Sequence, residues 1–168
     1  MGNRGVLVDA HGEMTRRRWT THAWIACRMD VRGRSRPVAP PGHWTALFFS
    51  DDAAALAAGH RPCGYCRRED YVRFKETWAD VHGAANAPEM DARLHAERLG
   101  PRPIVNVSTL PDGAFAGDLQ ACWRVEGGRG RLWSWDGYGE PAALPPSLPL
   151  LTPSSVVRLL ERGYAPEG

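Results

Sequence analysis

The sequence lacks any long apolar run, any internal repeat and any low-complexity segment, and lysine is almost missing from it. Without an apolar run, we expect no signal peptide, no membrane span and no membrane partner, and we place the protein in the cytoplasm. Without a low-complexity linker, any second domain should pack against the first. The 168 residues, 43% of them hydrophobic, are enough for a real core and agree with a soluble globular protein.

Cysteine is also scarce, with four in the chain, and Cys63 and Cys66 have the C-x2-C spacing. In a reducing cytoplasm, such a pair indicates metal binding or redox chemistry rather than a structural disulfide. A thioredoxin-like redox pair would follow a strand in a βαβ pattern, whereas this pair follows an Ala-rich helix, so we favour a Zn²⁺ site. A tetrahedral site needs two more ligands, and the other cysteines are Cys27 and Cys122.

Hydrophobic periodicity and turn residues predict an α+β fold. We expect a zinc-binding module with a basic N-terminal hairpin at residues 1–102, and a β-rich extension with a terminal helix at 103–168. The expected hairpin and strands cover residues 4–18, 24–31, 44–49, 104–107, 113–115, 121–125 and 131–135. The expected helices cover residues 50–59, a segment from the cysteine pair to the breaker at 83–88, residues 89–99, and a capped helix within 150–163.

The segment from Phe48 to Cys66 reads FFSDDAAALAAGHRPCGYC, and Trp24 to Cys27 reads WIAC. Together, residues 24–66 resemble the zinc-binding (methylphosphotriester) module of the Ada DNA-repair family, in which an aromatic strand, an Ala-rich helix and a G-[FH]-R-P-C-x-x-C clip follow one another. The resemblance covers about a quarter of the chain. Because no helix-turn-helix or alkyltransferase motif accompanies it, we do not expect a complete Ada-type regulator.

The resemblance implies a small αβ fold whose zinc is held by four thiolates, one of which accepts a methyl group from a methylated DNA phosphate. Cys27, Cys63 and Cys66 match the family's ligand positions, and Cys27 matches the cysteine that would be the nucleophile. The family's second cysteine is replaced here by Val31, so the full ligand set does not carry over. The fourth ligand is then a histidine, Cys122, an acid or water.

His95 is the leading candidate for the fourth ligand, because its helix can fold back over the cysteine pair; a packed histidine without a metal is the alternative. Asp91, His95, Arg98 and Leu99 share one helix face at i, i+4, i+7 and i+8. That face either lies beside the zinc or a phosphate, or forms a solvated surface of salt bridges, and we favour the second.

A water as fourth ligand would make the zinc catalytic, with His95 or Glu97 as the proton carrier. This is the alternative of a zinc-dependent hydrolase: a nuclease, a glycosylase or a deaminase-like enzyme. The H-x-E and P-C-x-x-C halves of the deaminase signature are both present, but in reversed order, so deamination is disfavoured. A further alternative is a structural zinc module that recruits a partner, which would be DNA or a protein, without catalysis.

Eight of the 20 arginines fall within residues 1–36, against three acids. The planar guanidinium suits phosphate recognition, and Trp19 and Trp24 are interleaved with these arginines as in a nucleic-acid groove. Trp133 and Trp135 share one strand face, where core packing is favoured over base stacking. We therefore predict a zinc-binding, DNA-associated protein that acts in recognition or repair of damaged or modified DNA. The predicted phosphate contacts are Arg4, Arg16, Arg17, Arg18, Arg28 and Arg61.

Overall fold

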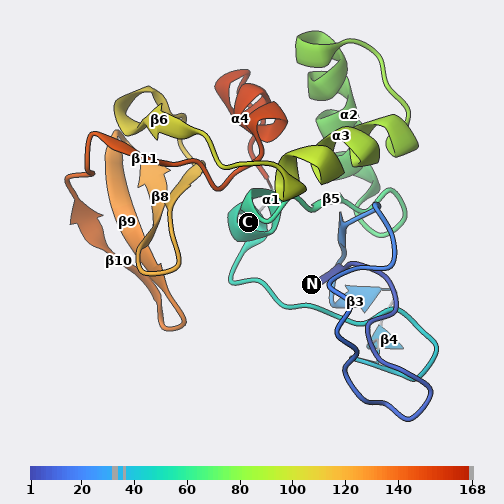
Figure 1. Cartoon of the computed structure of the whole chain (residues 1–168). Coiled ribbons are helices and arrows are strands. Elements are labelled where there is room, and N and C mark those ends of the chain that lie inside the picture. The colour runs from blue at the N-terminus through green and yellow to red at the C-terminus, as the bar shows by residue number, and fades with distance from the viewer. Residues whose placement is uncertain (32–33, 36, 167–168) are drawn as a thin grey trace.

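The computed structural model describes residues 1–31, 34–35 and 37–166, except for the side chains of residues 30–36. It is a mixed α+β structure, as predicted. A β-rich part lies on one side, two long helices lie on the other, and the N-terminal segment lies beneath the helices (Figure 1). Among the described residues, no helix is long and apolar enough to cross a membrane.

The N-terminal part contains very short strands. β1 (Gly2–Asn3), β2 (Ile25–Ala26) and β5 (Arg61–Pro62) form one sheet, while β3 (Asp30–Val31) pairs with β4 (Arg34–Ser35). The hairpin predicted over residues 4–18 is reduced to one bridge, between Val8 and Met14, and the strand predicted over residues 44–49 is reduced to a bridge from Leu47 to Gly2. Within residues 4–18, Gly5 and Gly12 adopt positive φ values of 97° and 84° and interrupt the segment before a longer ladder can form.

Four α-helices agree with the predicted ones, with shifted ends. They are α1 (Asp52–Ala57), α2 (Arg68–His82), α3 (Ala87–Leu99) and α4 (Ser154–Glu161). The N-cap of α1 is Asp51, one residue after the predicted start of the helix, since the Asp51 side chain accepts from the Ala54 N–H at 2.7 Å. Asn86 and Glu89 form a capping box that starts α3 earlier than predicted.

The β-rich part is a four-stranded antiparallel sheet in the order β10-β9-β8-β7. Its strands are β7 (Phe115–Gly117), β8 (Cys122–Glu126), β9 (Arg129–Ser134) and β10 (Gly137–Ala142). Gly127 and Gly128, with φ of 57° and 72°, form the turn between β8 and β9. A separate pair joins β6 (Ile104–Asn106) to β11 (Ser147–Pro149), with a 3₁₀ turn (Val107–Thr109) after β6.

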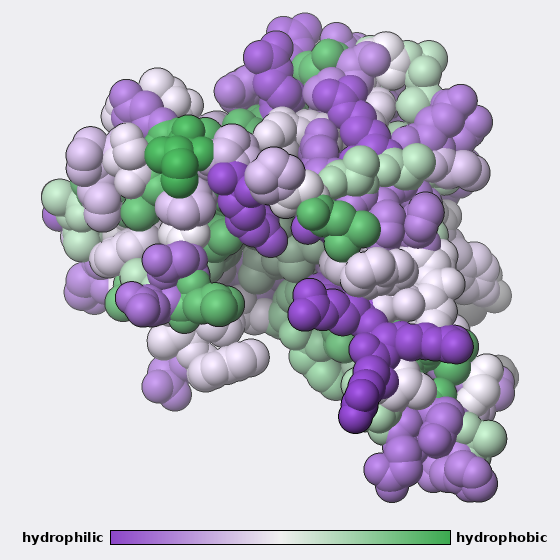
Figure 2. All heavy atoms as spheres, in the orientation of Figure 1, coloured by the Kyte–Doolittle hydropathy of each residue, from purple (hydrophilic) through white to green (hydrophobic). Residues whose placement is uncertain are grey.

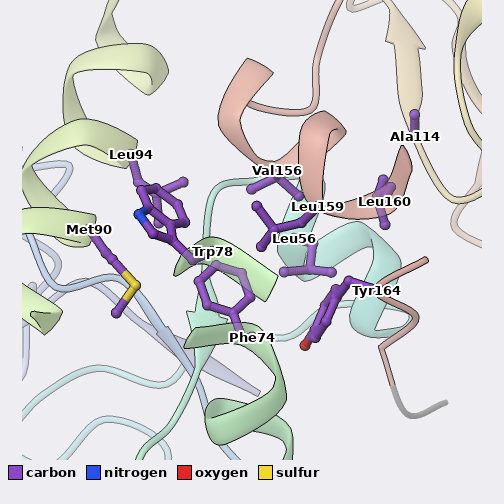
Figure 3. Packing of buried hydrophobic residues seen from close by; sticks show 10 residues of the cluster. All are labelled: Leu56, Phe74, Trp78, Met90, Leu94, Ala114, Val156, Leu159, Leu160 and Tyr164. Carbon is purple, nitrogen blue, oxygen red and sulfur yellow. The ribbon is translucent and has the colours of Figure 1, made fainter. Parts of the chain in front are cut away.

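The main hydrophobic core lies between α2, α3 and α4 (Figure 3). Phe74 and Trp78 project from the predicted apolar face of α2, and Met90 and Leu94 project from α3. From beyond the predicted boundary at residue 102, the core receives Ala114, Val156, Leu159, Leu160 and Tyr164. Both parts of the chain therefore contribute to one core.

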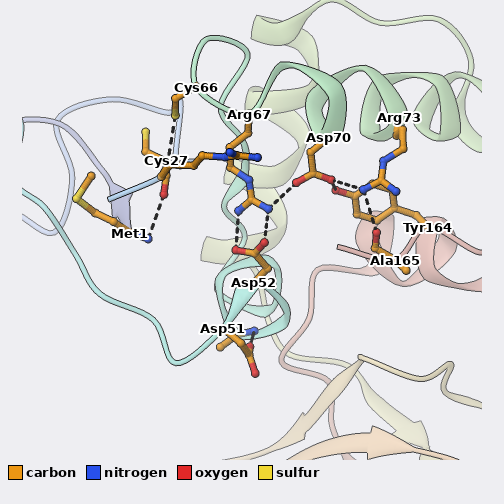
Figure 4. A network of polar contacts seen from close by, with 12 residues as sticks. Met1, Cys27, Asp51, Asp52, Cys66, Arg67, Asp70, Arg73, Tyr164 and Ala165 are labelled. Atoms are coloured by element: carbon orange, nitrogen blue, oxygen red, sulfur yellow. Dashed lines mark hydrogen bonds and ion pairs between the residues drawn. The ribbon is translucent and has the colours of Figure 1, made fainter. Parts of the chain in front are cut away.

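A polar network fastens the start of α2 to its neighbours (Figure 4). The buried carboxylate of Asp70 contacts Arg67 at 2.7 Å, Arg73 at 2.9 Å and the hydroxyl of Tyr164 at 2.9 Å. Arg67 also forms a bidentate pair with Asp52 of α1. Burial and the Asp70 carboxylate raise the pKa of Tyr164, which keeps the hydroxyl protonated as a donor.

Replacing Asp70 by alanine should destabilise the protein by about 1–3 kcal/mol, because the buried Tyr164 hydroxyl loses its acceptor and the buried Arg67 guanidinium keeps only one of its two carboxylates, that of Asp52. Glu69→Ala is the matched control. Glu69 is the exposed neighbour in the same helical turn, and its replacement should change stability by less than about 0.5 kcal/mol. Urea unfolding of the three proteins measures the difference, and equal effects at Asp70 and Glu69 would contradict this role for the network.

His60 is 1% exposed and lies against the rings of Trp24 and Phe49, while its Nε2 accepts from Arg4 at 3.3 Å. Burial, and then the positive charges of Arg4 and Arg98, hold the pKa of His60 well below its ordinary value. The folded protein therefore binds fewer protons at this site than the unfolded chain. The free energy of unfolding must fall as the pH drops below about 6.5, where the unfolded histidine begins to protonate.

We expect His60→Phe, which keeps a ring of similar size, to flatten the fall of stability between pH 6.5 and 5. One such group contributes at most about 1.4 kcal/mol per pH unit. His11→Gln, at an exposed position, should leave the pH dependence of the wild type unchanged. Unfolding free energies measured across this pH range test the prediction, which fails if His60→Phe and the wild type have parallel profiles.

Candidate metal centre

The parallel pairing of β2 with β5 brings together two cysteines that are 36 positions apart in the sequence. Ile25 pairs with Arg61 and Ala26 pairs with Pro62, so Cys27 and Cys63 are the next residues on each strand. The Cys63 N–H donates to the Ala26 carbonyl at 2.9 Å, which fixes this register. In parallel strands the side chains of corresponding residues point the same way, so both thiols lie on one side.

Local sequence allows the chain to reach this register. The parallel ladder uses the N–H groups of Arg61 and Cys63, so Pro62, which has none, loses nothing at the position between them. Gly59 ends the turn after α1 at a φ of 78° and packs against Arg98, where an added Cβ would come within 2.4 Å of the Arg98 Cδ. A side chain at Gly59 would both strain the backbone and displace Arg98.

Cys66 completes the group from the turn that precedes α2. Its Sγ accepts the Arg28 N–H at 3.4 Å, a bond that ties this turn to the segment after Cys27 (Figure 4). The sulfurs of Cys27, Cys63 and Cys66 all lie within 4.8 Å of one another. Cys27 and Cys63 are buried, and Cys66 is partly exposed.

The pKa values of Cys27 and Cys63 are shifted in opposite directions. The hydrogen bond from the Cys27 thiol, supported by the backbone N–H groups of Cys66 and Tyr65, lowers the pKa of Cys63. The same Cys27–Cys63 bond, together with burial, raises the pKa of Cys27. Cys63 therefore ionises before Cys27, and peptide donors directed at its sulfur stabilise the thiolate that a metal needs.

The donor set fits a soft or borderline-soft cation. Around a tetrahedral ion with Zn–S bonds of about 2.3 Å, neighbouring sulfurs lie roughly 3.8 Å apart, within the separation found here. Three thiolates match zinc better than magnesium or calcium, which take oxygen ligands. The group can therefore hold a metal ion such as Zn²⁺ through three sulfurs.

The structure does not bring His95 into this group. Its ring stacks on His22 at a centroid distance of 3.9 Å, meets the edge of Trp19 and lies 3.1 Å from the guanidinium of Arg98. Burial, and then the charges of His22 and Arg98, lower the pKa of His95. Among the described residues, only the three cysteines form a metal-binding group, so His95 is placed as a packed histidine.

Glu97 is also occupied away from the thiols. Its Oε2 accepts from the Ser155 N–H at 3.1 Å and from the Ser155 hydroxyl at 2.7 Å. The carboxylate thus caps the first turn of α4. Cys122 stands on β8, outside the three-cysteine group, and burial raises its pKa to about 11. Val31 pairs with Arg34 through its backbone, and its side chain is outside the described part.

The helix face shared by Asp91, His95 and Arg98 is not the solvated surface that was favoured. Asp91 is 5% exposed and binds Arg61 in a bidentate pair at 2.8 and 2.9 Å. This pair uses the Arg61 Nε and Nη2, and Nη1 donates to the Pro62 carbonyl. Arg61 therefore anchors α3 beside the cysteine clip, and at 7% exposure it is too buried to contact a DNA phosphate.

The other predicted phosphate contacts remain open to solvent to different degrees. Arg16, Arg17, Arg18 and Arg28 are exposed, and Arg28 lines a small hollow beside Cys66 and Tyr65. Arg4 is half-buried, with its Cζ 3.9 Å from the ring centroid of Trp24. Sequence reasoning missed that Arg98 reaches the same ring, at 4.1 Å; its i+7 spacing from Asp91 was the available signal.

Comparison with known proteins adds no relative to this picture. No family model, no curated protein and no solved structure matches the chain. The function must therefore be inferred from the chain's own residues, and first from the three thiols that β2, β5 and the turn before α2 bring together.

Proposed function

We propose that this chain is a zinc-binding, DNA-associated protein with an Ada-like metal module, acting at damaged or modified DNA. The observation that carries the proposal is the convergence of Cys27, Cys63 and Cys66, whose sulfurs lie within 4.8 Å of one another although they come from two distant segments. These are the positions that match the family's ligands. Where thiols are kept reduced, a converging group of cysteines favours metal binding over a structural disulfide.

Association with DNA is supported by the arginines near the metal site. Arg28 follows Cys27 directly and lines the hollow that also contains the partly exposed Cys66. Arg16, Arg17 and Arg18 are exposed on the N-terminal segment. Exposed guanidiniums on one segment supply the sequence-independent attraction to DNA phosphates.

Methyl transfer to Cys27 would be a further step. When bound, zinc would keep the thiolates deprotonated and nucleophilic near neutral pH. Cys27 is 3% exposed, so a DNA methyl group would reach its sulfur only if the covering residues moved. Cys66 is the more accessible sulfur, and recognition without transfer is therefore the form of the function that the geometry favours.

We expect one Zn²⁺ per chain in the purified protein, with three sulfurs and one lighter ligand by X-ray absorption. Cys27→Ser and Cys63→Ser should each lower zinc affinity by at least about 100-fold, because a thiolate is removed from a closed set. Cys122→Ser and His95→Ala are the matched controls and should keep the metal, since neither residue belongs to the group. Loss of zinc from either control, or no stoichiometric zinc in the wild type, would contradict the proposed site.

Binding to DNA should weaken uniformly across sequences when the exposed arginines are replaced. The triple variant Arg16→Gln, Arg17→Gln, Arg18→Gln should reduce the slope of log affinity against log salt by up to about three, one for each guanidinium that no longer neutralises a phosphate. A control with the same charge change replaces three exposed arginines elsewhere: Arg93, Arg158 and Arg162. Fluorescence anisotropy with a labelled duplex at several salt concentrations gives both slopes, and equal slopes would refute this surface as the DNA-binding face.

A further inference from the structure

A cleft of about 560 Å³ lies between the N-terminal segment, the end of α3 and the chain before α4. Figure 2 shows a hollow between the β-rich part and the N-terminal part, with strongly hydrophilic side chains along its rim. Its volume falls within the range of sites for small organic ligands, roughly 300–1,000 Å³. The cleft is separate from the hollow beside Cys66, with which it shares no lining residue.

The charge of this cleft is strongly one-sided. Four arginines line it: Arg4, Arg18, Arg98 and Arg102. Of the described residues in the lining, Glu97 is the one acid, and its carboxylate caps α4. Within the described part of the chain, none of the four arginines forms an ion pair with a carboxylate.

Two of these cations are held close together in a partly buried place. Arg4 and Arg98 each place Cζ about 4 Å from the ring centroid of Trp24, so the two guanidiniums lie within about 8 Å of each other. Burial lowers the pKa of both; at Arg98 the Asp91 and Glu97 carboxylates oppose this effect, and the charge of Arg4 adds to it. Two partly buried like charges that form no direct ion pair with a carboxylate of the described residues favour the entry of an anion.

The arginines also retain donors for such an anion. The Nε of Arg4 donates to the Nε2 of His60, and the Nη1 of Arg102 donates to the Leu151 carbonyl. No hydrogen bond to a described residue engages the other nitrogens of either side chain. Arg98 is different: Nη1 and Nη2 donate to the carbonyls of Gly59 and His22, which fixes its position at the wall. Its Nε is buried without a partner among the described residues.

The aromatic wall gives the cleft a second kind of contact. Trp19 lines it and is only partly buried. The edge-on contact with His95 and the tilted contact with Trp24 hold the Trp19 ring in place. A fixed indole beside guanidiniums offers a stacking surface for a base next to donors for its phosphate, which is how proteins hold single-stranded nucleic acid.

We propose that this cleft binds one unpaired nucleotide of DNA, with its phosphate at Arg4, Arg18 and Arg102 and its base against Trp19. A base inside a duplex is stacked and cannot enter a cleft of this kind, so the site selects a nucleotide that is flipped out or single-stranded. That the nucleotide belongs to DNA rests on the proposed function. That the ligand is a nucleotide rests on the arginines and the indole of the cleft itself.

The test compares three probes on the zinc-loaded protein at low salt: inorganic phosphate, thymidine 5′-monophosphate and a six-residue thymidine oligonucleotide, with binding followed by calorimetry. We expect the nucleotide to bind at least tenfold more tightly than phosphate, and the oligonucleotide to compete with it. Arg18→Gln and Arg102→Gln, both at exposed positions, should each weaken nucleotide binding about tenfold, whereas Arg158→Gln, at an exposed position on α4, should not.

Trp19→Leu tests the contact with the base apart from the contact with the phosphate. It should weaken binding of the nucleotide about tenfold and leave binding of inorganic phosphate unchanged. Arg16→Gln, at an exposed position outside the cleft, should weaken binding of the oligonucleotide only.

The proposal is overturned if the nucleotide binds no better than phosphate, if Arg102→Gln binds the nucleotide normally, or if the oligonucleotide does not compete with it. If duplex DNA binds but the nucleotide does not, the proposed function stands and the cleft proposal fails; if the nucleotide and oligonucleotide bind this cleft in a protein that holds no zinc, the metal assignment fails alone.

Discussion

The parallel register of β2 and β5 is the constraint on which the candidate metal centre depends. Each strand has only two residues, yet the bond from the Cys63 N–H to the Ala26 carbonyl decides which residue faces Cys27. A slip of one position would turn one thiol to the opposite face and put Pro62 where the ladder needs an N–H donor. Pro62 therefore helps to fix the register, because it has no N–H and only this alignment places it where the ladder needs no donor.

A pair of two-residue strands has little stability of its own, so other contacts must hold it. The Arg61–Asp91 pair connects β5 to α3, and the Arg67 pairs connect the following turn to α1 and α2. A metal bound to Cys27 and Cys63 would close a loop of 36 residues and remove much of the freedom of the unfolded chain. The core between α2, α3 and α4 contains none of the three cysteines, so its packing does not depend on that closure.

The sequence predicted the helices better than the strands, for a physical reason. In α2, Tyr71, Phe74 and Trp78 follow one another at intervals of three and four residues, a signal that local sequence contains in full. By contrast, β10 reads GYGEPA, which has poor strand propensity, and it forms because β9 supplies the pairing edge. The short strands β1 and β5 likewise exist through partners far away in the sequence.

The same distinction applies to the site: the spacing of Cys63 and Cys66 predicted their shared role, and the family resemblance added Cys27. The position of His95 could not be predicted, since it depends on where α3 docks. Asp91 pairs with Arg61 beside the clip, and His95, one helical turn or about 5.4 Å further along, meets His22 instead of the thiols.

Arginine has two uses in this chain, and its partners distinguish them. Arg61 and Arg67 are buried and paired with aspartates, so they join segments and contribute no free charge. Arg4 and Arg98 flank Trp24, which precedes Cys27 by three residues, so at most about 11 Å separates the Cα atoms of Trp24 and Cys27. The segment that contains β2 therefore contributes both to the candidate metal centre, through Cys27, and to the wall of the cationic cleft, through Trp24.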